Sequence, residues 1–192
     1  YVGLVEVGVG LIPGGGGLTY IARRAAEMAA AGNANADIFA FLKDGFTNAA
    51  MAKVATSALE AQKLGYLLDS DIIVPNKDEL LFVATAQAKA MADSGYRAPL
   101  KAKFPVAGRS GIATVKSSLA NMRDGGFISA HDFHLASLIA DVVCGGEVEA
   151  GSLVTEEYLM SLERKHFCSL LEHPKTQERI MGMLQTGKPV RN

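Results

Sequence analysis

Four consecutive glycines follow a proline over residues 13–17 and divide the chain into two unlike parts. Glycine reaches backbone conformations that other residues avoid, so this segment is expected to form a loop. Before it, residues 1–11 are rich in valine with isolated glycines, which predicts a short buried strand with bends. After it, residues 18–31 carry apolar positions at helical spacing. We therefore expect a residual strand and glycine loop over residues 1–17 and a helical region over residues 18–192.

The helical region is expected to contain several helices joined by short connectors. Capping residues, glycines and prolines mark where these helices begin and end. The predicted helices are 37–43, a segment from 48 or 57 to 64, 76–91, 111–122, 129–144, 155–172 and 174–185, with a short strand or extended link at 71–74. The fold class is therefore mainly α with a short β segment at the N-terminus. A whole α/β domain would supply more strands, so the chain is expected to be part of a longer protein.

The composition indicates a soluble globular protein. About half the residues (49%) are apolar, 20% are charged, and the net charge is −1. This balance argues against a non-specific nucleic-acid-binding protein, which needs a basic excess. No apolar run approaches the roughly 20 residues that span a bilayer. Two cysteines, Cys144 and Cys168, make neither a disulfide framework nor a zinc quartet, and are expected to be buried or partly buried thiols in a reducing cytoplasm.

Glu6 is a carboxylate in an otherwise apolar run, just ahead of the proline-glycine loop. A buried carboxylate must be paired, hydrogen-bonded or protonated. An apolar pocket raises the pKa of a carboxyl group towards neutrality, which suits a general acid or base. The alternative is that Glu6 ends a strand and faces water, as most glutamates do. Residue type alone favours this alternative.

The glycine loop also has competing interpretations. Gly8 and Gly10 resemble the start of a dinucleotide-binding turn, but Pro13 stands where its third glycine would be. The loop lacks the Gly-Lys-Ser/Thr of a phosphate-binding P-loop. A plain turn from strand to helix would need fewer glycines, so we expect something to lie against this backbone. The N-terminus of the following helix would also stabilise nearby negative charge.

Residues 4–17 resemble the second catalytic-glutamate motif of the crotonase (enoyl-CoA hydratase/isomerase) superfamily. That motif places a glutamate seven residues before the proline of a P-G-x-G-G loop, and a helix follows; Glu6 and Pro13 have this spacing. Residues 57–66 look like the family's A-x-x-A-x-x-x-G-L-V helix, and residues 163–188 are similar to its closing helices. Residues 1–13 most resemble the crotonase module at the C-terminus of bacterial proteins that begin with a 3-hydroxyacyl-CoA dehydrogenase.

The resemblance implies that the chain is the C-terminal helical part of a crotonase domain in a fatty-acid β-oxidation enzyme. In that family two glutamates activate a water that adds to an enoyl-CoA, giving 3-hydroxyacyl-CoA, and Glu6 matches the glutamate that exchanges a proton with the α-carbon. Pro13 and Gly14 would line the substrate site. By position, Leu171 and Lys188 fall near residues that contact the adenine and phosphates of coenzyme A.

The same resemblance implies what this chain lacks. The first glutamate and the two backbone amides that stabilise the enolate-like oxygen are expected upstream, so the isolated chain is expected to be inactive. The expected substrate is a coenzyme A thioester. No cofactor is expected on this segment, and NAD would serve the dehydrogenase domain of the parent enzyme. The closing helices of the family also help to trimerise, which implies a homo-oligomer.

His131 and His134 are three residues apart on one predicted helix and are candidate metal ligands. No carboxylate or third ligand follows at a zinc-site spacing, so we interpret both as ordinary core or surface histidines. Two other functions stay open for the whole chain. It could be a non-catalytic helical association module, which would not need a carboxylate aimed into an apolar pocket. It could also serve another crotonase chemistry, such as an isomerase or a thioester hydrolase.

Overall fold

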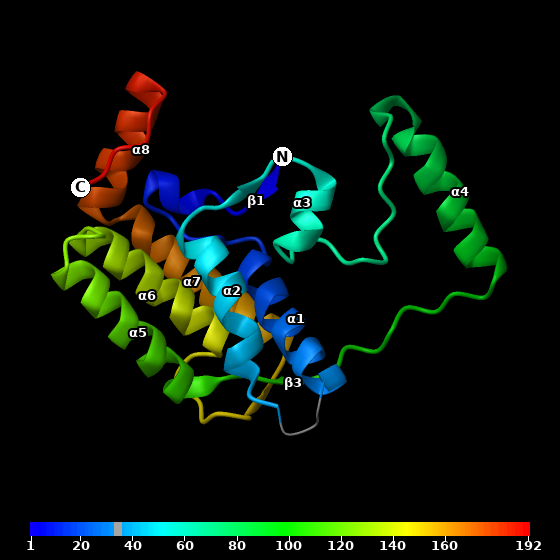
Figure 1. Cartoon of the computed structure of the whole chain (residues 1–192), viewed down its shortest axis with the longest axis horizontal. Helices are drawn as coiled ribbons and strands as arrows, with labels where there is room; N and C mark the ends of the chain where they lie inside the picture. The colour runs from blue at the N-terminus through cyan, green and yellow to red at the C-terminus, as the bar shows by residue number, and fades with distance from the viewer. Residues whose placement is uncertain (33–35) are drawn as a thin grey trace.

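The computed structural model describes residues 1–32 and 36–192, and these are mainly helical (Figure 1). The elements in chain order are β1 (Val2–Gly3), the 3-10 helix η1 (Glu6–Val9), α1 (Gly17–Gly32), α2 (Ile38–Ala50), β2 (Val54–Ala55), α3 (Ala58–Lys63), the 3-10 helix η2 (Lys77–Glu79), α4 (Leu80–Asp93), β3 (Phe104–Pro105), α5 (Gly108–Asp124), α6 (Ala130–Cys144), β4 (Leu153–Val154), α7 (Glu156–Leu171) and α8 (Pro174–Thr186). A mainly helical chain agrees with the prediction from sequence.

The core forms around α6, which packs against α1, α2, α5 and α7. Leu135, Ile139 and Val142 on α6 are completely buried. Full burial of such a side chain stabilises the folded state by about 1.5–3 kcal/mol. The face of α1 that meets the core is made mostly of alanines, which lets neighbouring helices approach closely. These five helices are the main body of the molecule.

Local capping determines where most of the helices begin. Asp37, Ser57 and Thr155 each accept a hydrogen bond from a backbone N–H in the first turn of α2, α3 and α7. Ser129 and Asp132 form a reciprocal capping box at the start of α6. Such bonds satisfy amides that have no partner within the helix. Asp37 and Ser129 are confirmed as helix starts, and of the two starts left open for the helix that ends near residue 64, Ser57 is the one observed. The helix that begins at Asp37 does not end at residue 43 as predicted but continues to Ala50.

The predicted strand over residues 1–11 is wrong beyond its first residues. Only Val2 and Gly3 form strand β1, paired antiparallel with β2, and the 3-10 helix η1 occupies Glu6–Val9. The reason lies at Gly10, whose φ of 78° ends η1 in the left-handed conformation. Leu11 N–H then bonds back to the carbonyl of Glu6 at 3.0 Å. Glycine freedom and burial of Val7 override the β preference of the valines.

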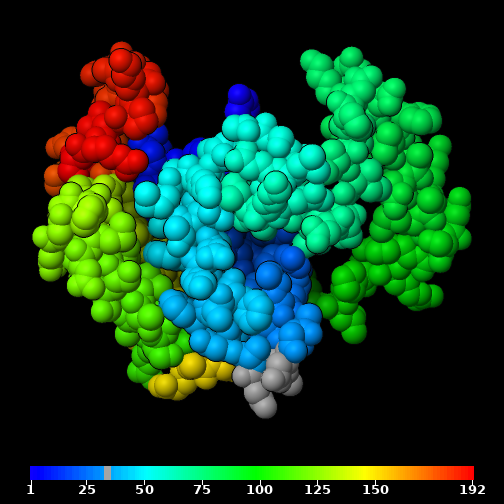
Figure 2. Space-filling view, in the orientation of Figure 1, coloured from blue at the N-terminus to red at the C-terminus, as the bar shows by residue number. Residues whose placement is uncertain are grey.

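Residues 65–103 form an arm that leaves the body after α3 and returns at β3, which pairs antiparallel with β4. Figures 1 and 2 show that α4, on the right of both views, stands away from the other helices. No residue of α4 is buried, and Leu81 and Phe82 are 79% and 76% exposed. Residues 71–74 form an extended link rather than a strand, and Asn76 caps η2 rather than the long helix itself.

Across the described ranges, none of the helices combines the length and the apolar character that crossing a bilayer requires. Cys144 on α6 is buried as expected, and burial raises the pKa of its thiol to about 12. Cys168 on α7 is exposed, which the sequence did not predict.

Candidate functional site

Glu6 is the first residue of η1 and lies on a tight turn rather than in a strand. One of its carboxylate oxygens, Oε2, is buried and has no hydrogen-bond partner among the described residues. Leaving a buried polar atom unpaired costs about 1–3 kcal/mol. This oxygen is therefore available to a ligand that can donate a hydrogen bond.

Tyr66, which follows α3, lies close enough to Glu6 for an electrostatic interaction between the two side chains. Its hydroxyl donates a hydrogen bond to the carbonyl of Lys53 at 2.8 Å. Burial raises the pKa of Tyr66 above its ordinary value, and the negative charge of Glu6 adds to this increase. Tyr66 could not be predicted as a site residue from the sequence, because α3 meets the N-terminal segment only through tertiary packing.

The glycine loop is packed by α7. Pro13 is buried, and a Cβ added at Gly14 would lie 2.8 Å from Cδ2 of Phe167. The group that lies against this backbone is thus the aromatic ring of Phe167. Gly14 itself is exposed on its other side. Glycine is therefore needed at position 14 because the Phe167 ring leaves no room for a side chain there.

The positive N-terminus of α1 is occupied by the side chain of Glu163. This α7 carboxylate is completely buried and accepts hydrogen bonds from the backbone N–H of Gly16 at 2.7 Å and of Thr19 at 2.5 Å. A carboxylate at a helix N-terminus pairs with unsatisfied amides and with the helix dipole. The negative charge that the N-terminus of α1 was expected to stabilise is thus the carboxylate of Glu163, a side chain of this chain.

Leu171 and Lys188 are separated by α8. Leu171 ends α7 and is 44% exposed, whereas Lys188 follows the C-terminus of α8 and is exposed. The 13 residues of α8 span about 20 Å at the usual helical rise. The structure does not bring these two side chains together, so a ligand that touches both must be extended.

His131, His134 and His173 form a stack of imidazole rings where α6 meets the start of α8. Their ring centroids lie 4.6 to 6.1 Å apart, with interplanar angles near 28°. Stacked rings do not aim their nitrogen lone pairs at one point. In residues 1–32 and 36–192 no group of three or more His, Cys, Asp or Glu side chains is placed to hold a metal ion.

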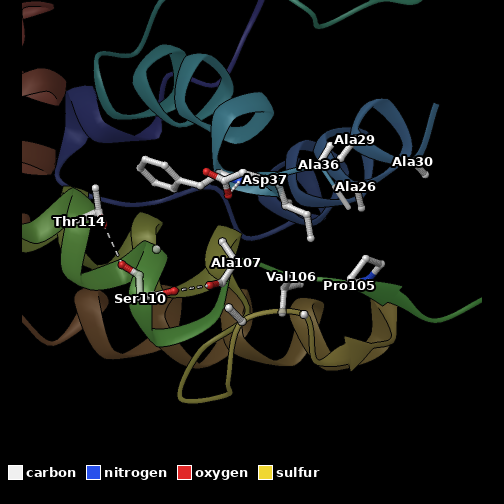
Figure 3. A pocket seen from close by; sticks show the side chains of 15 residues that line it. Ala26, Ala29, Ala30, Ala36, Asp37, Pro105, Val106, Ala107, Ser110 and Thr114 are labelled. Atoms are coloured by element: carbon white, nitrogen blue, oxygen red, sulfur yellow. Dashed lines mark hydrogen bonds between the residues drawn. The ribbon is translucent and has the colours of Figure 1, made fainter. Parts of the chain in front are cut away.

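A cavity of about 600 Å³ lies away from Glu6, between α1, α2, β3 and α5 (Figure 3). Its polar groups are already used for structure: Ser110 and Thr114 donate to helix carbonyls, and Asp37 caps α2. Small apolar side chains make up most of the remaining lining, including Ala26 and Ala29. None of the residues that the sequence selected lines this cavity, and its chemistry does not indicate catalysis.

Comparison with known proteins gives one informative relative. The chain is 42% identical over 197 aligned residues to the "Probable 3-hydroxyacyl-CoA dehydrogenase" of Bacillus subtilis (strain 168). The alignment covers the whole of this chain but only 24% of that protein, so the chain spans about a quarter of its relative's length. No protein-family model matches the chain, and no solved structure matches it.

Proposed function

We propose that this chain is part of an enoyl-CoA hydratase unit within a longer fatty-acid β-oxidation enzyme, and that Glu6 is its proton-exchanging residue. The observation that carries the proposal is the Glu6 carboxylate, which has one buried oxygen without a hydrogen-bond partner among the described residues and precedes Pro13 by seven positions. A carboxylate held in this way can exchange a proton with a bound substrate. The spacing of Glu6 and Pro13, which resembles the crotonase motif, supports the same role.

The name of the similar protein supports a hydratase on chemical grounds. Hydration of an enoyl-CoA produces a 3-hydroxyacyl-CoA, which is the substrate of a 3-hydroxyacyl-CoA dehydrogenase. The two reactions are consecutive, so one polypeptide that holds both sites would pass the product directly to the next step. NAD would serve the dehydrogenase part, which we place outside this chain.

In the proposed reaction, the hydroxyl of a water molecule bonds to the β-carbon and a proton is added to the α-carbon. Glu6 supplies the α-carbon proton, and a second carboxylate from outside this chain accepts the proton that the water loses. The enolate-like oxygen needs backbone amide donors. Since Glu163 occupies the N-terminus of α1, we place those donors outside this chain as well.

The adenine and the phosphates lie at the same end of coenzyme A, so contact with both Leu171 and Lys188 requires the two side chains to reach towards each other along α8. Under this proposal Leu171 packs against the adenine, and the ammonium group of Lys188 pairs with a phosphate as a point charge. Pro13 and Gly14 line the acyl end, next to Glu6. The acyl end of the substrate would then contact the N-terminal loop of this chain, and the nucleotide end would contact its last two helices.

The first experiment compares the full-length enzyme with this isolated chain, each incubated with crotonyl-CoA in the absence of NAD. We expect the full-length enzyme to form 3-hydroxybutyryl-CoA and the isolated chain to form none. Product analysis separates hydration from double-bond isomerisation and from thioester hydrolysis. Turnover by the isolated chain would show that one carboxylate suffices and would contradict the division of the site.

A second candidate function is association, and the exposed arm favours it. The helix α4 carries apolar residues on all sides, with Lys89 and Asp93 as its only charged residues. A helix of this kind is usually buried in a complete structure. This role is compatible with catalysis in the full-length protein, because α4 can bind another surface without covering Glu6.

A further inference from the structure

The turn that carries Glu6 is held from one side by α8, as Figure 1 shows for the dark blue turn beside the C-terminal helix. The hydroxyl of Thr176 donates a hydrogen bond to the carbonyl of Gly10 at 2.6 Å. The guanidinium of Arg179 donates to the carbonyl of Val7 at 3.3 Å. Both carbonyls belong to η1 or its C-cap, so two side chains of one helix fix the turn.

The single proton of the Thr176 hydroxyl determines the direction of both hydrogen bonds that this group makes. The Thr176 hydroxyl donates its only proton to Gly10, so it must accept from His131 Nε2, which lies 3.1 Å away. His131 therefore carries its proton on Nε2. Its Nδ1 is buried without a hydrogen-bond partner in the described part of the chain, as expected for a neutral ring. A directed chain of donors thus runs from His131 through Thr176 to Gly10.

Arg179 is completely buried and is held in place by its own partners. Its guanidinium forms an ion pair with Asp132 at 2.8 Å and donates to the side chain of Asn192 at the same distance. Asp132 belongs to the capping box of α6. The orientation of Arg179 is therefore fixed by α6 and by the C-terminal residues before it reaches η1.

Gly10 is the point of closest approach between the turn and α8. A Cβ at Gly10 would lie 3.0 Å from Cα of Thr176 and 3.1 Å from Cδ of Arg179. Close packing of this kind leaves the turn little freedom to shift or rotate. Any loss of these contacts would change the direction in which the Glu6 carboxylate points.

We propose that Thr176 and Arg179, supported by His131 and Asp132, are positioning residues that orient the Glu6 turn for proton exchange. The inference rests on the proposed hydratase function. Neither residue is assigned a contact with the substrate. Each acts through a backbone carbonyl of the turn, and misplacement of a reacting group by about 1 Å can lower a rate about 100-fold.

The test replaces Thr176 in the full-length enzyme and measures hydration of crotonyl-CoA. T176V keeps the shape of the side chain but cannot donate to Gly10 or accept from His131. We expect its kcat to fall roughly 10- to 100-fold while KM changes less than about threefold. T176S keeps the hydroxyl and should retain kcat within about twofold. The matched control is T114V, which removes an exposed threonine hydroxyl that bonds only within α5.

Three further readouts separate positioning from a merely structural role. The dehydrogenase activity of T176V should stay close to that of the wild type, its melting temperature should stay above the assay temperature, and the pH profile of kcat/KM for hydration should shift. If T176V does not fold, R179K is measured instead, because it keeps a positive charge beside Asp132 but shortens the reach to Val7.

The outcomes distinguish the inference from the function on which it rests. Full hydratase activity in E6Q would overturn the proposed function. An inactive E6Q together with a T176V variant whose kcat matches T114V would overturn only the positioning role. A T176V variant that folds but loses dehydrogenase activity and hydration equally would also overturn it, since the effect would then not be specific to the Glu6 turn.

Discussion

Glu163 shows how a single side chain far away in sequence completes the loop beside Glu6. It lies on α7 yet caps α1 through the amides of Gly16 and Thr19, while Phe167, one turn later, packs under Gly14. The glycine loop and its helix could be predicted from local sequence. The cap could not, because nothing near the loop indicates which distant carboxylate reaches it.

The first prediction concerns this cap. E163Q keeps the size of the side chain but removes the charge and places an amide group against backbone donors. We expect it to lower the free energy of unfolding of this chain by about 1–3 kcal/mol, measured by chemical denaturation. E172Q, at an exposed glutamate after α7, should change it by no more than about 0.5 kcal/mol. Equal stability of the two variants would contradict the role of Glu163.

The second prediction concerns pH. Burial lowers the pKa of His131 to about 4 from an ordinary value of 6.5, and Arg179, His173 and His134 add to the decrease, whereas Asp132 opposes it. The unfolded chain therefore binds a proton on His131 at a higher pH than the folded chain does. Its contribution to stability is fully present above about pH 6.5 and is lost as pH falls towards about 4.

The measurement is the free energy of unfolding as a function of pH for the wild type and H131Q, in which the amide nitrogen can still donate to Thr176. The wild type should lose up to about 1.4 kcal/mol per pH unit more than H131Q within this window. Comparing the two chains removes the contribution of other titrating groups. Parallel curves would show that His131 is not kept neutral by folding.

At the scale of elements, local signals predicted the helices better than the turn. The capping residues Asp37, Ser57 and Ser129 act on amides two or three positions away, so sequence alone could place them. The conformation of η1 depends instead on Gly10 and on Thr176, which lies 166 residues further along the chain. A valine-rich run with glycines therefore predicted a strand where tertiary contacts support a 3-10 helix.

The third prediction belongs to the scale of elements and concerns the arm. The residues Lys77, Lys89 and Arg97 lie in the exposed arm, away from the packed body. Exposed segments with few buried contacts open most readily and are cleaved first. Trypsin should therefore cut this chain first within residues 65–103 and leave the remaining helices associated. Mass spectrometry of the early fragments identifies the sites.

The same digestion tests whether α4 is covered in the complete protein. If the rest of the polypeptide or a second copy buries α4, cleavage at Lys89 should be at least about tenfold slower in the full-length enzyme than in this chain, since cleavage requires the site to open. Equal rates would contradict the association role and would leave α4 as an exposed helix in both proteins.

At the scale of the whole molecule, the proposed function makes the candidate site one half of a catalytic centre. Sequence reasoning selected Glu6 and Pro13 because their spacing is local. It could not find Tyr66, Glu163 or Thr176, which reach this region only through folding. The relative from Bacillus subtilis is about four times as long as the aligned region, which leaves ample chain for a second carboxylate and a dehydrogenase domain.

The most direct test of the account is hydration by the E6Q variant of the full-length enzyme, followed in D2O to detect exchange at the α-carbon. We predict that E6Q loses at least about 100-fold of its kcat for crotonyl-CoA hydration, because a positioned acid or base contributes about 100- to 10,000-fold to such a rate, and that the rate of deuterium exchange at the α-carbon of 3-hydroxybutyryl-CoA falls to a similar extent. Its dehydrogenase activity should remain. Hydration and exchange at wild-type rates would show that Glu6 does not transfer the proton, and the proposed function would have to be abandoned.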